Sequence, residues 1–234
     1  MTTPAPGAPE SDSLRRIAHP IHTILLLLVV AAIAVRGVIY ADAMRAASRV
    51  QIYELTLLME WLVFAFVLLG VWLARSPLAS VLGERWSSAR DFARDLGIGI
   101  AYSILSTIVL SMLLPHSAAA DRSVRFLLPQ GRKETILWIA LSVSAGICEE
   151  ALYRGYLQKQ FAALTNSVVA GIVLSGAAFG LSHAYQGPHL ALVIAIDGMM
   201  LGALAQWRRT VRPGMISHAL KDSLAPFLMA AMKH

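Results

Sequence analysis

The chain alternates long apolar runs with short polar segments, and this alternation limits its possible folds more than any other feature. A helix of about 20 apolar residues crosses the ~30 Å hydrocarbon core of a bilayer, where every backbone polar group must be paired within the helix. Hydrophobic residues make up 57% of the 234 residues and charged residues only 15%, against about 25% charged residues in soluble domains. A soluble globular domain is therefore excluded. We predict an all-α, polytopic transmembrane helical bundle with about seven membrane-spanning helices, over residues 21–40, 55–73, 96–114, 134–161, 167–185, 188–207 and 213–232.

The polar segments divide the chain into three parts. Residues 1–20 begin with a stretch rich in Pro, Ser, Thr and Gly, which predicts a disordered N-terminal tail. Residues 21–130 are predicted to hold three scaffold transmembrane helices, together with an amphipathic surface helix over the charged and aromatic segment 76–95. Residues 134–232 are predicted to form a four-helix core that carries the chemistry.

The first apolar run could be a membrane anchor or a signal peptide. Arg15 and Arg16 precede it, and residues 32–34 (Ala-Ile-Ala) resemble a cleavage site. Because the run continues to Tyr40, it is long for a signal peptide, and we expect an uncleaved anchor. Loops on the N-terminal side of the membrane hold slightly more Lys and Arg than those on the other side. The positive-inside rule then predicts an integral membrane protein of the cell inner (plasma) membrane with a cytoplasmic N-terminus.

The net charge of +6 has two possible meanings. Nucleic-acid binding would need a block of Lys and Arg with interleaved aromatic residues, and the sequence has none. The basic residues lie mostly in loops, where they suit lipid headgroups, so we predict the lipid bilayer and no nucleic acid as a partner. Cys148 is the only cysteine, which excludes a disulfide within the chain and a multi-cysteine metal cluster.

Ionisable side chains inside the predicted spans gather in the second half of the chain. Each costs at least ~2.5 kcal/mol to insert into a membrane, so such residues indicate function. They are Glu149, Glu150, Arg154, His183, Asp197, His218, Lys221 and Asp222. This asymmetry predicts that the first three spans are scaffold and the last four hold the site.

Helical spacing indicates which of these side chains share a helix face and a depth in the membrane. Glu150 and Arg154 are four residues apart and share a face, whereas Glu149 points about 100° away from them. Counted along the spans at ~1.5 Å per residue, the depths of Glu149, His183, His218 and Asp222 are broadly similar. We therefore expect these four side chains to meet in one cavity within the membrane.

Such a set of residues favours hydrolysis of an amide by activated water. A carboxylate in an apolar cavity suits a general base, with a histidine as its partner. A second histidine and a protonated acid can donate hydrogen bonds to a developing oxyanion. The sequence has neither a serine elbow nor the H-E-x-x-H zinc pattern, and we assign no metal ligand and no cofactor.

Three short patterns in the second half resemble one known family. Residues 149–154 read E-E-x-x-x-R, residues 179–183 read F-x-x-x-H and residues 218–222 read H-x-x-x-D. In this order, and within apolar spans, they resemble the CAAX-protease and bacteriocin-processing (CPBP) family, which is related to the type II CAAX prenyl endopeptidases. The resemblance covers residues 134 to about 228 and implies an intramembrane glutamic endopeptidase.

The resemblance also implies roles for six residues. Glu149 would be the base that activates water and His183 its partner, while His218 and Asp222 would form the oxyanion site. Glu150 and Arg154 would support them. Asn is common in the family where Asp222 stands, so Asp222 is either protonated or orients His218. An older interpretation of the family makes these residues metal ligands, which leaves zinc as the alternative cofactor.

Other interpretations stay open. Glu149 could lie at an interface, the pair of Glu150 and Arg154 could be structural, and His183 could end a helix. Asp197 is more readily explained as structural than as catalytic. The function expected is an intramembrane endopeptidase that acts on a membrane-associated or lipid-linked polypeptide. The alternatives are a metal-dependent peptidase, a catalytically silent immunity or partner-binding membrane protein, and a transporter. The sequence indicates neither prenylation of the substrate nor the oligomeric state.

Overall fold

The computed structural model describes residues 15–113 and 125–231, and every regular element in these ranges is a helix. The N-terminal half contains α1 (Pro20–Ile39), α2 (Ala41–Ala46), α3 (Arg49–Leu73), α4 (Ala79–Leu82) and α5 (Ala89–Ser111). The C-terminal half contains α7 (Gly131–Glu150), the π-helix η1 (Ala151–Leu157), α8 (Gln158–Thr165), α9 (Val168–Ser182), the 3₁₀ turn η2 (Ala184–Gln186), α10 (Pro188–Arg208) and α11 (Arg212–Ala231).

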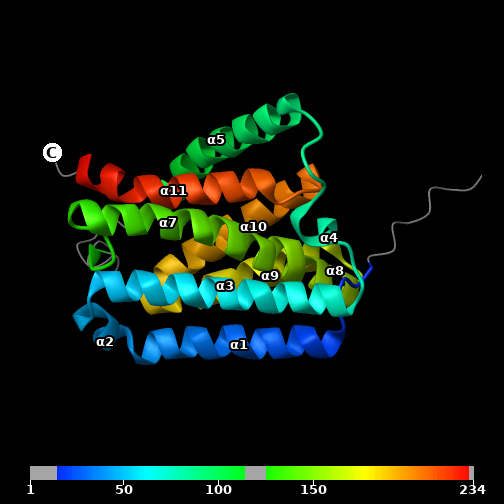
Figure 1. The fold of residues 1–234 in the computed structure, drawn as a ribbon, viewed down its shortest axis with the longest axis horizontal. Helices are drawn as coiled ribbons and strands as arrows, with labels where there is room; N and C mark the ends of the chain where they lie inside the picture. The colour runs from blue at the N-terminus through cyan, green and yellow to red at the C-terminus, as the bar shows by residue number, and fades with distance from the viewer. Residues whose placement is uncertain (1–14, 114–124, 232–234) are drawn as a thin grey trace, which may run out of the picture.

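The long helices lie roughly parallel or antiparallel in two layers. Figure 1 shows α1, α3, α7 and α11 side by side, with α5 tilted across the end of the row, and each helix contacts its neighbour. The helices α8, α9 and α10 form the second layer behind this row. There α9 packs along α10 and against α8. The segment η1 lies between the layers, in contact with α3, α4, α9 and α10.

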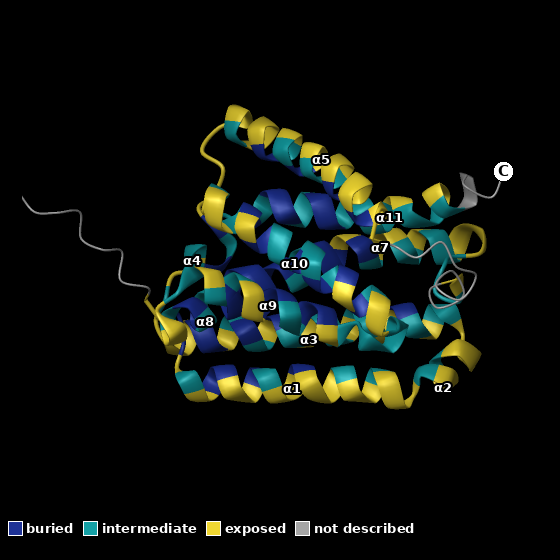
Figure 2. Ribbon diagram, turned by 180° about the vertical axis from the view of Figure 1, so that it is seen from behind, coloured by how far each residue is buried: buried dark blue, intermediate teal, exposed yellow. Residues whose placement is uncertain are grey.

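The distribution of exposed apolar side chains is that of a membrane protein. Large apolar residues on α1 face outward, with Ile21 60%, Ile24 57% and Leu28 61% exposed. Similar exposed faces run along α3 and α5, while the buried residues gather in the middle of the bundle (Figure 2). An exposed apolar surface this extensive is not stable in water and fits a hydrocarbon surrounding.

The predicted all-α polytopic fold is confirmed, and every predicted span corresponds to a helix. Within the described residues, five segments are long and apolar enough to cross a membrane: α1, α3, α5, α10 and the continuous stretch from α7 through α8. The helix α9 is apolar but has only 15 residues. The helix α11 has 20 residues and is not among the five, since it carries charged side chains in its middle.

The prediction of an amphipathic surface helix over residues 76–95 is wrong. Only the four residues of α4 are helical before α5 begins at Ala89. Gly83 ends α4 with a φ of +78°, and a Cβ there would lie 2.4 Å from the Thr210 hydroxyl oxygen, so the chain must leave the helix at this point. Ser88 then caps α5 by accepting a hydrogen bond from the Asp91 backbone N–H.

The expected N-terminal tail is shorter than residues 1–20. Ile17 and Ala18 are buried, although they precede α1. The Gln160 side chain accepts from the Ile17 N–H at 2.9 Å and donates to the Ala18 carbonyl at 3.0 Å. Residues 15–20 therefore belong to the fold, and the rest of the predicted tail lies outside the described residues.

Candidate active site

The carboxylates of Glu149 and Glu150 lie where the long helix of the second half changes its hydrogen bonding. They are the last two residues of α7, and the next seven residues form the π-helix η1, all of them buried. A regular α-helix was expected here. Single π turns occur often at functional sites, because the wider turn re-aims the side chains beside it.

Glu150 and Arg154 form the ion pair that their spacing predicts. The Arg154 Nη1 lies 2.9 Å from the Glu150 Oε1, and both side chains are fully buried. The guanidinium also lies over the Phe179 ring, with 4.3 Å from Cζ to the ring centroid. Arginine is suited to such a buried pair, because it is weakly hydrated and always charged. Breaking the pair would leave an uncompensated charge in the core.

His218 lies among the three acids of the site, Glu149, Glu150 and Asp222. Its Nδ1 lies 3.1 Å from the Glu150 Oε1, and its Nε2 lies 3.4 Å from the Asp222 Oδ2 and 3.7 Å from the Glu149 Oε2. This approach needs a glycine on α7, since a Cβ at Gly146 would lie 2.7 Å from the Met215 carbonyl oxygen of α11. An imidazole with a carboxylate at each nitrogen is best placed when both nitrogens carry protons.

Glu149 is the least satisfied acid of the group. Its side chain is 21% exposed, yet its Oε2 is buried and has no hydrogen-bond partner among the described residues. Buried carboxylate oxygens are normally paired. The unpaired oxygen is therefore available to a water molecule or a substrate.

His183 ends α9 on the other side of the same space. Its Nδ1 lies 3.0 Å from the Phe179 carbonyl oxygen and 3.1 Å from the Ser182 hydroxyl. A carbonyl only accepts hydrogen bonds, so Nδ1 carries the proton and Nε2 is left free. No direct contact joins His183 to Glu149 among the described residues, and the histidine nearest Glu149 is His218.

Glu149 and His183 both line one cavity, of about 290 Å³. Most of its wall is apolar and comes from α1, α3 and η1. The ionisable side chains in the wall, besides Glu149 and His183, are Arg36, Glu60, Cys148, Tyr40, Tyr153 and Tyr185. Glu149 and His183 thus share one cavity, to which the N-terminal half adds a wall, whereas His218 contacts Glu149 and Asp222 without either His218 or Asp222 lining this cavity.

Glu60 was missed in the sequence analysis. It lies on α3 and accepts a hydrogen bond from the Ser144 hydroxyl at its Oε2, with 2.6 Å between the oxygens. Glu60 is the one charged residue in the apolar run 55–73. The insertion cost that pointed to the other acids applies equally to Glu60 and could have identified it.

Asp197 and Lys221 form a separate pair. The Lys221 Nζ lies 2.5 Å from the Asp197 Oδ2, and the Tyr102 hydroxyl donates to the Asp197 Oδ1 at 3.2 Å. These contacts tie α10, α11 and α5 together. This supports a structural explanation for Asp197.

A metal site would need several acids or histidines around one point. In the ranges 15–113 and 125–231, no three His, Cys, Asp or Glu side chains are placed to share one ion. His218 turns both ring nitrogens toward carboxylates, whereas a metal would need a nitrogen lone pair.

One segment of the chain matches a known protein family. Residues 131–224 match the family described as Rce1-like, type II CAAX prenyl endopeptidase Rce1-like. The match begins with α7 and ends in α11, so it contains all six residues assigned from the sequence. The chain carries a domain of this family. The resemblance drawn from the three patterns is confirmed.

The match of residues 131–224 has two direct consequences. The family is one of CAAX-type proteases, so the chain has an intramembrane protease domain. Together with the apolar helices, it makes the chain an integral membrane protein. Neither a comparison with curated proteins nor one with solved structures gave a match.

Proposed function

We propose that the chain is an intramembrane endopeptidase that cleaves a membrane-associated or lipid-linked polypeptide with water activated by Glu149. One observation carries the proposal: the Glu149 carboxylate lines an apolar cavity and keeps one oxygen unpaired. The neighbouring acid Glu150 is neutralised by Arg154. Glu149 is thus free to accept a proton, as a general base must be.

In the proposed reaction, Glu149 removes a proton from a water molecule that lies between it and His183. The free Nε2 of His183 accepts the other hydrogen of this water and orients it. The hydroxide attacks the carbonyl carbon of the scissile bond, and the carbonyl oxygen becomes an oxyanion. An apolar cavity strengthens each of these electrostatic interactions, because little water screens them.

His218 and Asp222 are proposed to stabilise the oxyanion. The His218 Nε2 lies between Asp222 and Glu149, so its proton can turn toward an oxygen that forms beside Glu149. Asp222 orients the ring and balances its charge. Glu150 contacts the other ring nitrogen, Nδ1, and Arg154 forms an ion pair with Glu150.

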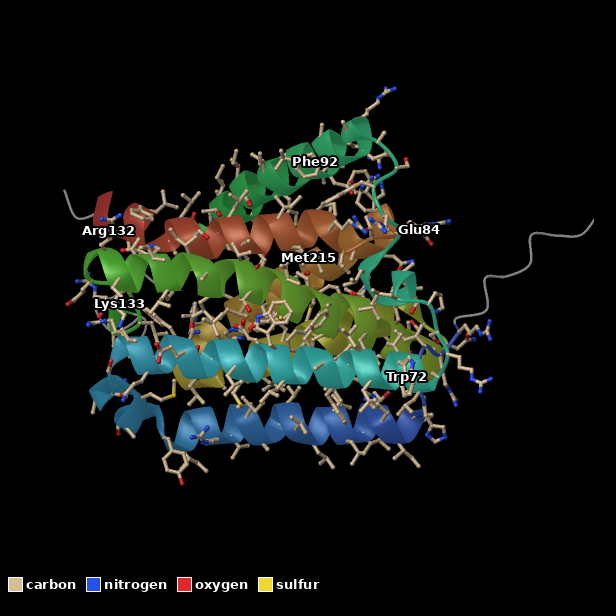
Figure 3. The ribbon with its side chains drawn as sticks, viewed as in Figure 1. Trp72, Glu84, Phe92, Arg132, Lys133 and Met215 are labelled. Atoms are coloured by element: carbon tan, nitrogen blue, oxygen red, sulfur yellow. The ribbon has the colours of Figure 1, made fainter. Side chains whose placement is uncertain are left out.

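The orientation in the membrane is also a proposal. Arg132 and Lys133 lie at one end of the bundle, and Trp72 and Glu84 lie at the other (Figure 3). The second end also holds Arg208, Arg209 and Arg212, between α10 and α11. By the positive-inside rule this end is cytoplasmic, and the N-terminus with it, in the cell inner membrane.

The test is a comparison of peptide termini in cells that produce the wild-type protein or Glu149→Gln. We expect a set of new termini in the wild-type cells that is absent with Glu149→Gln, because an amide cannot accept the proton. The matched control is Glu54→Gln, an exposed acid on α3. Identical termini in the wild-type and Glu149→Gln cells would refute the proposal.

A metal-dependent peptidase using the same residues is the competing mechanism. Purified protein in liposomes can be tested with the peptide identified in cells, before and after exhaustive chelation. Retained cleavage is expected for the glutamic mechanism. Loss of cleavage, with stoichiometric zinc that disappears in His183→Ala, would replace it with the metal mechanism.

A further inference from the structure

We infer that Glu60 is a second catalytic acid, which delivers a proton to the leaving amine. The inference rests on the proposed hydrolysis and adds a residue from the N-terminal half to it. Glu60 lies on α3, outside the matched segment 131–224. It lines the same cavity as Glu149 and His183.

The Glu60 side chain is held in place by a hydrogen bond from a neighbouring helix. Ser144 is buried on α7 and donates its hydroxyl proton to the Glu60 Oε2 at 2.6 Å. The other carboxyl oxygen has no hydrogen-bond partner among the described residues. The carboxyl lies close enough to Glu149 for their charges to interact. One oxygen of Glu60 is therefore held while the other faces the cavity.

Among the described residues no cation forms an ion pair with Glu60, and Glu149 has only the His218 Nε2, at 3.7 Å. Arg154 pairs with Glu150, and the His218 imidazolium lies against Asp222. The remaining cation in the wall is Arg36 on α1, which forms no ion pair among the described residues. Two carboxylates in one apolar cavity repel each other, which favours a state in which the pair shares a proton.

The histidines of the site do not supply the missing proton. His183 uses its Nδ1 proton on the Phe179 carbonyl, so the neutral ring presents a lone pair to the cavity. His218 has its Nδ1 proton against Glu150, and its Nε2 proton serves the oxyanion in the proposed reaction. Breaking an amide bond requires a proton on the nitrogen. Besides Glu149, which holds the proton taken from water, the Glu60 carboxyl in the cavity wall can give it.

The reaction balances with this assignment. Ionised Glu149 takes a proton from water, and the hydroxide adds to the carbonyl carbon. The carbon–nitrogen bond then breaks as the nitrogen takes the proton of the Glu60 carboxyl, giving a carboxylic acid and an amine. Glu149 is now protonated and Glu60 ionised, and transfer of one proton between them restores the starting state.

The experiment compares two substrates that differ in the leaving group. A quenched fluorogenic peptide carrying the cleavage sequence found in cells is prepared with the native amide and with a thioester at the scissile bond. A thiol has a pKa of about 8.5 and leaves without a proton, whereas an amine does not. General-acid catalysis is worth about 10²–10⁴-fold.

We expect Glu60→Gln in liposomes to lower kcat for the amide by about 10²-fold or more, with KM little changed and thioester cleavage close to wild type. Glu149→Gln should lose both activities, and Glu54→Gln neither. Equal loss of both activities in Glu60→Gln would show a structural role, and an unchanged amide rate would show no role; either overturns the inference. Activity in Glu149→Gln would instead refute the proposed function.

Discussion

Two buried polar networks in this molecule differ in how completely they are paired. The first joins α1 to η1 and α8 through His22, Thr23, Tyr156 and Gln160. None of its side-chain nitrogen or oxygen atoms is buried without a partner. The second surrounds the cavity, and there buried atoms of Glu149, Glu150 and Arg154 have no hydrogen-bond partner.

The difference is consistent with a structural role for the first network and with the proposed chemistry for the second. A buried polar group that is left unpaired costs about 1–3 kcal/mol, so a purely structural network is expected to be complete. Several buried atoms of the network at Glu149 are unpaired, so this network carries that cost in free energy. An incomplete network has room for the hydrogen bonds of a substrate, and a complete network does not.

The largest effect on stability is expected from Arg154→Met. The substitution keeps the apolar stem and leaves the buried Glu150 charge without its partner, which costs about 3–5 kcal/mol. We expect a clear fall in the temperature of unfolding in detergent. Arg132→Met, at an exposed end of the bundle, is the matched control. An unchanged unfolding temperature in Arg154→Met would mean that Glu150 is not held as a charge.

A smaller effect is expected from Gln160→Leu, in the complete network. The Ile17 N–H and the Ala18 carbonyl would lose their partner, at a cost of about 1–3 kcal/mol. Trypsin should then cut faster at Arg15 and Arg16, while the rate of peptide cleavage per folded molecule stays the same. Gln51→Leu, an exposed residue of α3, serves as control. A loss of cleavage in folded Gln160→Leu would contradict the separation of the two networks.

The smallest effect is expected from Ser144→Ala. It removes one hydrogen bond to Glu60 and keeps the acid, which costs about 0.5–1.5 kcal/mol of stability. Amide cleavage should fall less than in Glu60→Gln, because the carboxyl is still present but less well placed. Ser111→Ala removes a comparable hydroxyl at the exposed end of α5. A Ser144→Ala rate below that of Glu60→Gln would mean that the serine itself takes part in the reaction.

Much of the site could be predicted because its spacing is local. Glu150 and Arg154 meet in η1 as they would in an α-helix, since residues four apart lie on adjacent turns. The meeting of Glu149 with His218 and Asp222 could be expected only roughly, from similar depths in the membrane. The π-helix could not be predicted, because the packing around η1 imposes it and no residue in it is a specific signal.

Glu60 belongs to the half predicted to be scaffold, yet it lines the cavity beside Glu149. The sequence analysis looked for clusters of charged residues, and a single acid in an apolar run does not form one. The prediction of a surface helix over residues 76–95 was wrong because it also relied on a pattern of charges alone. Alternating charges suggested an amphipathic face, but Gly83 turns the chain and Trp86 donates to Asp95 across the loop at 2.9 Å.

Apolar runs and the cost of burying charge were enough to predict a helical membrane protein with an active site in its second half. Those properties depend on local composition and on the bilayer, which acts on each helix separately. The identity of the histidine beside Glu149, the free nitrogen of His183 and the presence of Glu60 in the cavity required the packed structure. They depend on contacts between α3, α7, α9 and α11, which are distant in sequence and meet only when the helices pack.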